Sequence, residues 1–261
     1  MVQLATHLAQ SYYDKPLPPL EAETVVVQSN ELTRWLSLFL AHQHGIVSHI
    51  DFPYPSAYIW ALFHQLLPNT PQESTFSTQV MAWRLFELLP ECCQQSGFDP
   101  IKSYLGEEDD PLKRYALAHR IADTFDQYLM YRPDWIEQWE QGDTPHWQAR
   151  LWQRLTVQKG DARHQTQHRA HLLTQLKQYL ASCEQRPDTL PERIAIFGIS
   201  ALPPVYLELF SLMAKHCDIT VYFLSPSAEY WGDITDKETT TQTDIDYFNS
   251  GHSLLASLGK Q

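Results

Sequence analysis

A run of three β-branched residues, Val25-Val26-Val27, most constrains the fold of this chain. Such a run is typical of a strand buried on both faces of a parallel sheet. The segment Gln28-Ser29-Asn30 follows at once, and Asn30 is predicted to cap a helix that begins at Glu31. In an open α/β sheet, ligands bind beyond the carboxyl ends of the strands. We therefore expect the residues after the valine run to border a binding crevice.

Hydrophobic periodicity divides the rest of the chain into two kinds of segment. Between residues 57 and 186 the apolar spacing is helical, most clearly over Leu112–Tyr131. Strand patterns return at Arg193–Ile199 and Ile219–Leu224, with a helix between them. Right-handed crossovers would place all three strands in one parallel sheet. We predict an α/β domain made of residues 1–56 and 187–261, interrupted by an all-helical insertion over residues 57–186.

Prolines and glycines mark the expected ends of the helices. Gly45 is predicted to end the helix that begins at Glu31, and Pro90 is predicted to stop a helix over Thr75–Leu89. Neither end of the chain carries a clear opening strand or closing element. We therefore expect a segment of a longer protein that lacks its first strand.

An α/β domain with a helical insertion is the plan of the first motor domain of a helicase, yet the residues for ATP hydrolysis are absent from the sequence. A phosphate-binding loop needs G-x-x-x-x-G-K-[ST] after a strand, and none of the nine glycines fits this pattern. The predicted strands end in Gly198-Ile199-Ser200 and Leu224-Ser225-Pro226, without the carboxylate that would hold magnesium. We predict no ATPase activity and no bound cofactor.

The charge and the apolar runs limit the classes of partner. The formal net charge is −12, which counts against non-specific coating of DNA but allows a local binding groove. No apolar run is long enough to span a membrane, and the first residues do not resemble a signal peptide. The four cysteines include no C-x-x-C pair. We expect a reduced, cytoplasmic protein with no membrane partner.

Two clusters resemble metal sites. His164, His168 and His171 are spaced so that one side of a helix could carry all three, as in a zinc site, but a solvated helix start is the favoured interpretation. Asp123 and Asp126 share one side of the Leu112–Tyr131 helix, but no third acid and lysine follow at the spacing of a metal nuclease. These two carboxylates are interpreted as a polar helix face or as acceptors for cytosine N4. We predict no metal site and no catalytic residue.

Aromatic and basic residues are the remaining candidates for nucleic-acid contacts. Several aromatic residues could stack on bases, although most at helical spacing are expected to be core. These residues are Trp60, Trp83, Tyr131, Trp135, Trp139, Trp147 and Trp152. Trp60 is the favoured exception because it follows the proline-rich loop that leaves the first strand and helix. Arg34 and Arg169 are candidate donors, each with an exposed surface role as the alternative.

Four phrases of the chain together resemble a known family. They are VVVQSNELTRWL, GIVSHIDFPYPSAYIW, DQYLMYRPDWIEQW, and FGISALPPVYLELF with YWGDI. In this order they resemble the gamma subunit of exodeoxyribonuclease V, the RecC family, almost from end to end of the chain. The resemblance implies a helicase-like (RecA-like) fold without an ATP site, in a non-catalytic subunit. It also implies RecB-like and RecD-like partner subunits that carry the helicase and nuclease activities.

The resemblance further implies a role in double-strand break repair and recombination. Members of the family line the tunnel for the 3′-ended single strand and recognise the chi sequence in it. The family's chi-reading positions correspond here to Gln28, Asn30, Arg34, Tyr54, Trp60, Asp123, Thr124, Asp126 and Arg169. Asn30, Arg34, Tyr54 and Thr124 differ from the usual Thr, Gln, Leu and Leu. Arg34 in particular changes the donor pattern that is offered to a base.

Three functions remain open from the sequence. The favoured one is a DNA-reading and scaffolding subunit without catalysis. An ATP-driven helicase or nuclease fragment is the second. The third is a protein-interaction module of the same complex that makes no base contacts.

Overall fold

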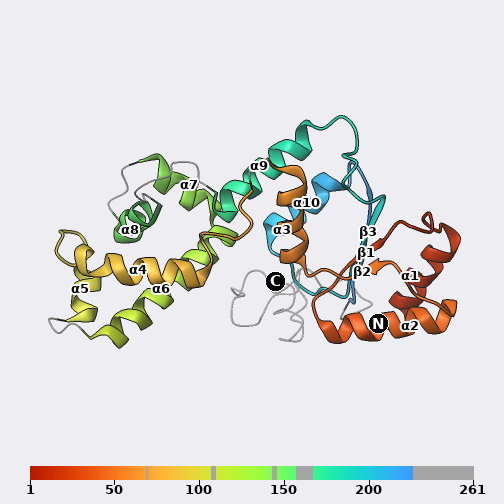
Figure 1. Cartoon of the computed structure of the whole chain (residues 1–261), viewed down its shortest axis with the longest axis horizontal. Helices are drawn as coiled ribbons and strands as arrows, with labels where there is room; N and C mark the ends of the chain where they lie inside the picture. The colour runs from red at the N-terminus through yellow and green to blue at the C-terminus, as the bar shows by residue number, and fades with distance from the viewer. Residues whose placement is uncertain (69, 107–109, 143–145, 157–166, 226–261) are drawn as a thin grey trace, which may run out of the picture. The chain divides into compact units, whose positions relative to one another are not determined.

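The computed structural model describes residues 1–68, 70–106, 110–142, 146–156 and 167–225 (Figure 1). It contains a small parallel sheet and many helices, which confirms the predicted α/β class. The chain forms two compact units. Unit 1 comprises Met1–Tyr54, Arg193–Leu202 and a segment that begins at Ile219, and unit 2 comprises Pro55–Glu192 and Pro203–Asp218. The domain boundaries predicted from sequence, a helical insertion over residues 57–186 within an α/β domain, stay a prediction.

The sheet has the strand order β2-β1-β3-β4. Its strands are β1 (Glu23–Val26), β2 (Ile50–Asp51), β3 (Arg193–Phe197) and β4 (Asp218–Tyr222). Central strand β1 pairs in parallel with both neighbours, with Thr24 opposite Asp51 on one side and Ile194 on the other. Strand β2 was not among the predicted strands, because two residues are too few to show an alternating pattern.

Two helices of unit 1, α1 (Val2–Asp14) and α2 (Asn30–His44), share a core with the sheet. This core consists of buried apolar side chains from both helices and from three strands. Its fully buried members include Ala5, Leu8, Val25, Val27, Leu36, Leu40 and Phe197. The alternation of Val25 and Val27 places both on one face of β1, since successive side chains of a strand point to opposite faces.

The predicted capping residue of α2 was wrong by one position. Ser29 is the N-cap, with extended backbone angles (φ −149°, ψ 155°), and its hydroxyl accepts a hydrogen bond from the Leu32 amide at 3.2 Å. Asn30 is already helical, so its side chain cannot cap in this way. Gly45 ends the helix with φ at 82°, and its amide donates to the Ala41 carbonyl. The positive φ explains why a glycine stands there.

Unit 2 is built from eight helices within the described residues. They are α3 (Pro55–Leu66), α4 (Thr78–Cys92), α5 (Asp99–Leu105), α6 (Pro111–Tyr131), α7 (Pro133–Gln141), α8 (Trp147–Thr156), α9 (Arg169–Ser182) and α10 (Pro204–Met213). Helix α6 packs along α4, and the ring of Phe125 on α6 meets Trp152 on α8 edge to face at 5.3 Å. Helix α9 contacts α3, α6 and α10. Helix α5 carries no strong periodic pattern and was not predicted.

The expectation that Pro90 stops a helix was also wrong. Helix α4 continues through Pro90 to Cys92. Pro90 lies in the last turn, where the missing amide removes a single helical hydrogen bond. The turn is kept because Leu89 and Cys92 are fully buried and the Cys93 amide still donates to the Leu89 carbonyl at 3.0 Å.

The cap of α2 gives a test of this correction. We expect Ser29→Ala to lower the free energy of unfolding by about 1 kcal/mol, because the Leu32 amide loses its acceptor. Asn30→Ala should change it by less than about 0.5 kcal/mol, since surface substitutions away from such contacts have small effects. Urea denaturation followed by circular dichroism measures both. A larger loss for Asn30→Ala would contradict the assignment of the cap.

Candidate nucleic-acid interface

In unit 1, four of the predicted DNA-binding residues gather at the carboxyl end of β1. Gln28 follows the strand, and Asn30 and Arg34 lie on the first turns of α2; all three are exposed. The Val27 amide donates to the Pro53 carbonyl at 3.0 Å, and this bond holds the loop before Tyr54 beside the strand end. Tyr54 is 38% exposed. The structure thus brings together the neighbours of Gln28 and Tyr54, which are 26 positions apart in the sequence.

The side chains of this set are not engaged with other parts of the described chain. Within the described residues, Gln28, Arg34 and Tyr54 have no side-chain hydrogen bond or ion pair. An exposed guanidinium and amide keep all their donors and acceptors for a ligand. A glutamine can bind adenine through two hydrogen bonds, and an arginine can bind guanine in the same manner.

In unit 2, the predicted residues on α6 and α9 make three separate polar contacts. Asp126 on α6 pairs with Arg169 at the start of α9, with 3.4 Å between Oδ1 and Nη1 and each side chain 32% exposed. Asp123 pairs with His119, four residues earlier on α6, at 3.2 Å. The Thr124 hydroxyl donates to the Arg120 carbonyl of its own helix at 2.9 Å. The donors of Arg169 and Thr124 are therefore partly committed, whereas the remaining oxygens of Asp123 and Asp126 can accept.

Tyr206 on α10 belongs to the surroundings of the Asp126–Arg169 ion pair and was missed by the sequence analysis. It is 4% exposed, and burial raises the pKa of its hydroxyl. The Arg169 charge opposes this rise, and the Asp126 charge adds to it. In the sequence, Tyr206 occupies an apolar position of a predicted helix. No pattern therefore distinguished it from residues that only pack in the core.

Trp60 on α3 is half-buried. Its ring meets Phe63 at 5.7 Å and His64 at 5.5 Å, both edge to face. The His64 ring lies within hydrogen-bonding distance of the Trp60 carbonyl at 3.0 Å and of the Pro71 carbonyl at 3.1 Å. These contacts hold the indole, and no ring of the described residues stacks in parallel on it.

The other tryptophans divide between core and surface. Trp139 and Trp152 are 6% and 0% exposed, as expected for core aromatics. Trp83 is 53% and Trp135 is 40% exposed. The Trp83 ring lies 5.2 Å from that of Tyr115, which itself lies 6.2 Å from His119. The rings of Trp83, Tyr115 and His119 therefore form a row on α4 and α6 that ends at the ion pair of His119 with Asp123. The sequence patterns did not indicate this row.

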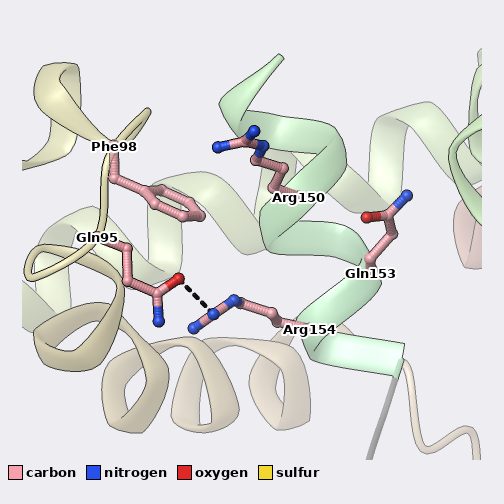
Figure 2. A pocket seen from close by; sticks show the side chains of 5 residues that line it. All are labelled: Gln95, Phe98, Arg150, Gln153 and Arg154. Atoms are coloured by element: carbon pink, nitrogen blue, oxygen red, sulfur yellow. Dashed lines mark hydrogen bonds between the residues drawn. The ribbon is translucent and has the colours of Figure 1, made fainter. Parts of the chain in front are cut away.

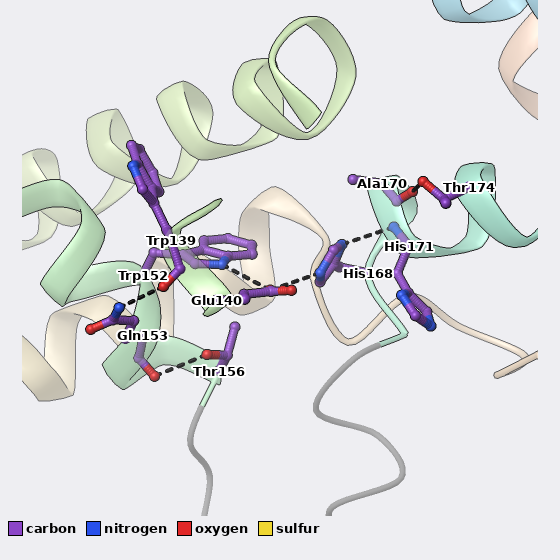
Figure 3. A network of polar contacts seen from close by, with 9 residues as sticks. All are labelled: Trp139, Glu140, Trp152, Gln153, Thr156, His168, Ala170, His171 and Thr174. Atoms are coloured by element: carbon purple, nitrogen blue, oxygen red, sulfur yellow. Dashed lines mark hydrogen bonds and ion pairs between the residues drawn. The ribbon is translucent and has the colours of Figure 1, made fainter. Parts of the chain in front are cut away.

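The histidine cluster has a structural role at the start of α9 (Figure 3). His168 is only 2% exposed, so the expectation of a solvated helix start was wrong for this residue. Its Nδ1 accepts from the His171 amide at 3.2 Å, and its Nε2 lies 2.8 Å from Glu140 Oε1. Because Nδ1 accepts, Nε2 carries the proton and donates to the carboxylate. His168 thus caps α9 and ties it to α7.

Glu140 receives a second hydrogen bond in this network, from Trp152 Nε1 at 3.0 Å (Figure 3). Burial alone would raise the pKa of Glu140, but the hydrogen bonds from His168 and Trp152 lower it below its ordinary value. Among the described residues no group of three or more His, Cys, Asp or Glu side chains could hold a metal ion. His164 lies outside the described residues.

This network predicts a pH-dependent contribution to stability. The folded-state pKa of Glu140 is lowered, so its stabilisation is present above its ordinary pKa and is lost as pH falls through the folded value. We expect Glu140→Gln to lower the free energy of unfolding by about 1–3 kcal/mol at pH 7, since charge-assisted bonds are replaced by neutral ones. The difference from wild type should shrink below about pH 4. Urea titrations from pH 3 to 7 measure it, and a difference independent of pH would contradict the assignment.

No helix among the described residues has the length and apolar character needed to cross a membrane.

Comparison with known proteins identifies the family. A family model described as RecC, N-terminal domain, matches residues 1–261. The Escherichia coli (strain K12) protein named RecBCD enzyme subunit RecC is 42% identical over 84% of this chain and 20% of its own length. Proteins of the same name from Haemophilus influenzae and Mycolicibacterium smegmatis are 36% and 30% identical, over 85% and 98% of this chain and 22% and 23% of their own lengths. The chain thus spans about a fifth of the length of these curated relatives. Its match to the family model from end to end, with this level of identity, shows that the chain belongs to the RecC family.

Proposed function

We propose that this chain is a non-catalytic, DNA-reading part of a RecBCD-type helicase-nuclease. In this proposal it lines the tunnel for the 3′-ended single strand and recognises chi during double-strand break repair. The observation that carries it is the set of exposed, unengaged polar side chains after β1, where a nucleotide-binding enzyme would hold phosphate. The family relationship supports the same assignment, because the curated relatives are named as RecBCD subunits.

The fold is proposed to be RecA-like without an ATP site. The connection from β1 to α2 consists of Val27, Gln28 and Ser29. Three residues without glycine are too few for a loop that wraps a phosphate with successive backbone amides. We also propose that residues 1–56 and 187–261 form this domain and that residues 57–186 form its helical insertion.

Each proposed contact follows from the chemistry of its side chain. Gln28 and Arg34 are assigned to base edges, with Asn30 beside them, and Tyr54 and Trp60 to stacking on bases. Asp123 and Asp126 are assigned as acceptors for an exocyclic amino group, with Thr124 between them. Arg169 is held by Asp126, so its guanidinium is oriented before a strand arrives.

The net charge of −12 means that this chain supplies little general attraction for DNA. We therefore propose that affinity comes mainly from RecB-like and RecD-like partner subunits, which also carry the ATPase and nuclease activities. The complex is proposed to act in the cytoplasm.

A second candidate is a protein-interaction module without base contacts. Exposed apolar side chains favour it, notably Leu20 at 88% and Leu112 at 81% exposure. Packing against partner subunits would cover such residues.

Substitution of Trp60 and Arg169 tests the proposed contacts in a reconstituted complex. We expect Trp60→Ala to weaken binding of a single strand by about 5- to 150-fold, the value of one lost base stack. Arg169→Ala should weaken it and reduce discrimination between chi-containing and scrambled strands. Fluorescence anisotropy at fixed salt measures both.

Trp135→Ala is the matched control, because Trp135 is an exposed tryptophan of the same unit outside the proposed contacts. If neither test variant differs from this control, the interaction-module alternative is favoured. Turnover of Mg-ATP by the chain alone would overturn the non-catalytic assignment.

A further inference from the structure

Unit 2 contains a pocket that none of the proposed base contacts uses (Figure 2). Its volume is about 390 Å³, and it lies between the turn that follows α4 and helix α8. Its lining residues are Gln95, Phe98, Arg150, Gln153 and Arg154. Two guanidinium groups therefore face one pocket from successive turns of the same helix.

Both guanidiniums are held in place by hydrogen bonds that leave donors free. Arg150 Nη1 donates to the Ser96 carbonyl at 3.1 Å. Arg154 donates through Nη2 to Gln95 Oε1 (Figure 2) and, more weakly, through Nη1 to Glu91 Oε1 at 3.4 Å. A guanidinium has five N–H donors, so each arginine retains donors for a ligand. Little side-chain entropy is then lost on binding.

The turn beside Arg150 depends on a glycine. Gly97 has φ at +93°, and a Cβ built there would lie 2.6 Å from Arg150 Nη1. A side chain at this position would displace the Arg150 guanidinium. The glycine therefore leaves the room that this guanidinium occupies. Phe98 next in sequence is 2% exposed, with the Arg154 guanidinium 6.0 Å from its ring centre.

The pocket is a positive site on an acidic chain. Helix α8 carries Arg150 and Arg154 and no acidic residue, and no carboxylate is among the residues that line the pocket. Of the two arginines, Arg154 forms an ion pair with Glu91. The Glu91 side chain is 67% exposed, so solvent screens this ion pair. By contrast, Arg193 is paired with Glu23 in a site where both side chains are less than 20% exposed.

The charged donors of the pocket come from the two arginines, and the amide nitrogen of Gln95 is a further, neutral donor. The amide nitrogen of Gln153 is committed to the carbonyls of Trp139 at 2.5 Å and Gly142 at 2.8 Å. Two guanidinium forks carried four residues apart on one helix suit an oxyanion with several oxygens better than a carboxylate with two. The volume also exceeds what a carboxylate alone would fill.

We propose that this pocket binds a backbone phosphate of a single DNA strand through Arg150 and Arg154. The affinity for phosphate follows from the pocket itself. The assignment of that phosphate to DNA rests on the proposed function, because a strand that is read by this chain needs local cations to offset the net charge of −12.

Binding of a tetrathymidylate to the full chain at low salt tests this proposal. We expect Arg150→Gln and Arg154→Gln each to weaken binding by about 10-fold or more, the value of one charge-assisted contact. The slope of log affinity against log salt should fall by about 0.7 for each arginine removed. Arg150→Lys should keep the slope and lose affinity, since it keeps the charge but not the fork.

Arg186→Gln is the control, because Arg186 is an exposed arginine of the same unit that does not line the pocket. Thermal melting of each variant checks that the fold is kept, and inorganic phosphate should compete with the strand in wild type only. A wild-type chain that binds neither tetrathymidylate nor inorganic phosphate would overturn the proposal. So would a tetraglutamate peptide that competes better than tetrathymidylate, since the site would then fit an acidic protein segment.

Failure here and failure of the proposed function are separable. If Trp60→Ala and Arg169→Ala weaken binding while the pocket variants match Arg186→Gln in affinity and salt slope, the pocket assignment is wrong and the base-reading assignment stands. If the pocket variants alone weaken binding, the chain holds a strand by its backbone and the base-reading assignment fails.

Discussion

The parallel pairing of β1 with β3 is the interaction on which the α/β unit depends. It joins Thr24 to Ile194, residues 170 positions apart in the sequence, and so requires the chain between them to leave the sheet and return. The Arg193–Glu23 ion pair reinforces this junction, with Nε of Arg193 donating to the carboxylate at 2.8 Å and the pair largely withdrawn from solvent. The hydrogen bonds that the Arg193 guanidinium donates to the Glu23 carboxylate raise the pKa of Arg193, so the guanidinium stays charged. The exposed residues after β1 are positioned by this pairing together with the pairing of β1 with β2 and the Val27–Pro53 hydrogen bond.

In unit 2, helices α7, α8 and α9 are joined by a different kind of contact, a buried polar network within an aromatic core. His168 packs edge to face against the Phe76 and Trp152 rings, each 5.6 Å away, while its two ring nitrogens are satisfied by Glu140 and by the His171 amide. A buried imidazole without such partners would cost several kcal/mol. The network links α7, α8 and α9, and α9 carries Arg169 immediately after His168. The position of the proposed DNA contact at Arg169 is therefore set by a structural histidine.

The two proposed modes of DNA binding in unit 2 differ in what they can achieve. Asp123, Asp126 and Arg169 are partly paired with one another or with His119, which orients them for recognition but lowers their net charge. Arg150 and Arg154 face a pocket without carboxylates and suit attachment to a backbone phosphate. Phosphate contacts position a strand and base contacts specify its sequence. An acidic chain that reads DNA needs both, because base reading alone does not overcome its repulsion of the strand.

The α/β class, the parallel strands and the order of most helices follow from the sequence, because β-branched runs and apolar spacing are local and strong. The sequence lacks the fixed glycine pattern of a phosphate-binding loop after β1, and the absence of an ATP site stays a prediction on that basis. It placed the α2 cap one residue late and ended α4 at Pro90, because a cap depends on which residue turns helical first and a proline in a last turn costs little. Three features could be seen only in the folded chain. His168 is buried, and Asp126 forms an ion pair with Arg169. Arg150 and Arg154 line one pocket next to the turn at Gly97. These contacts join segments far apart in the chain, and no local pattern in a single sequence records such distances.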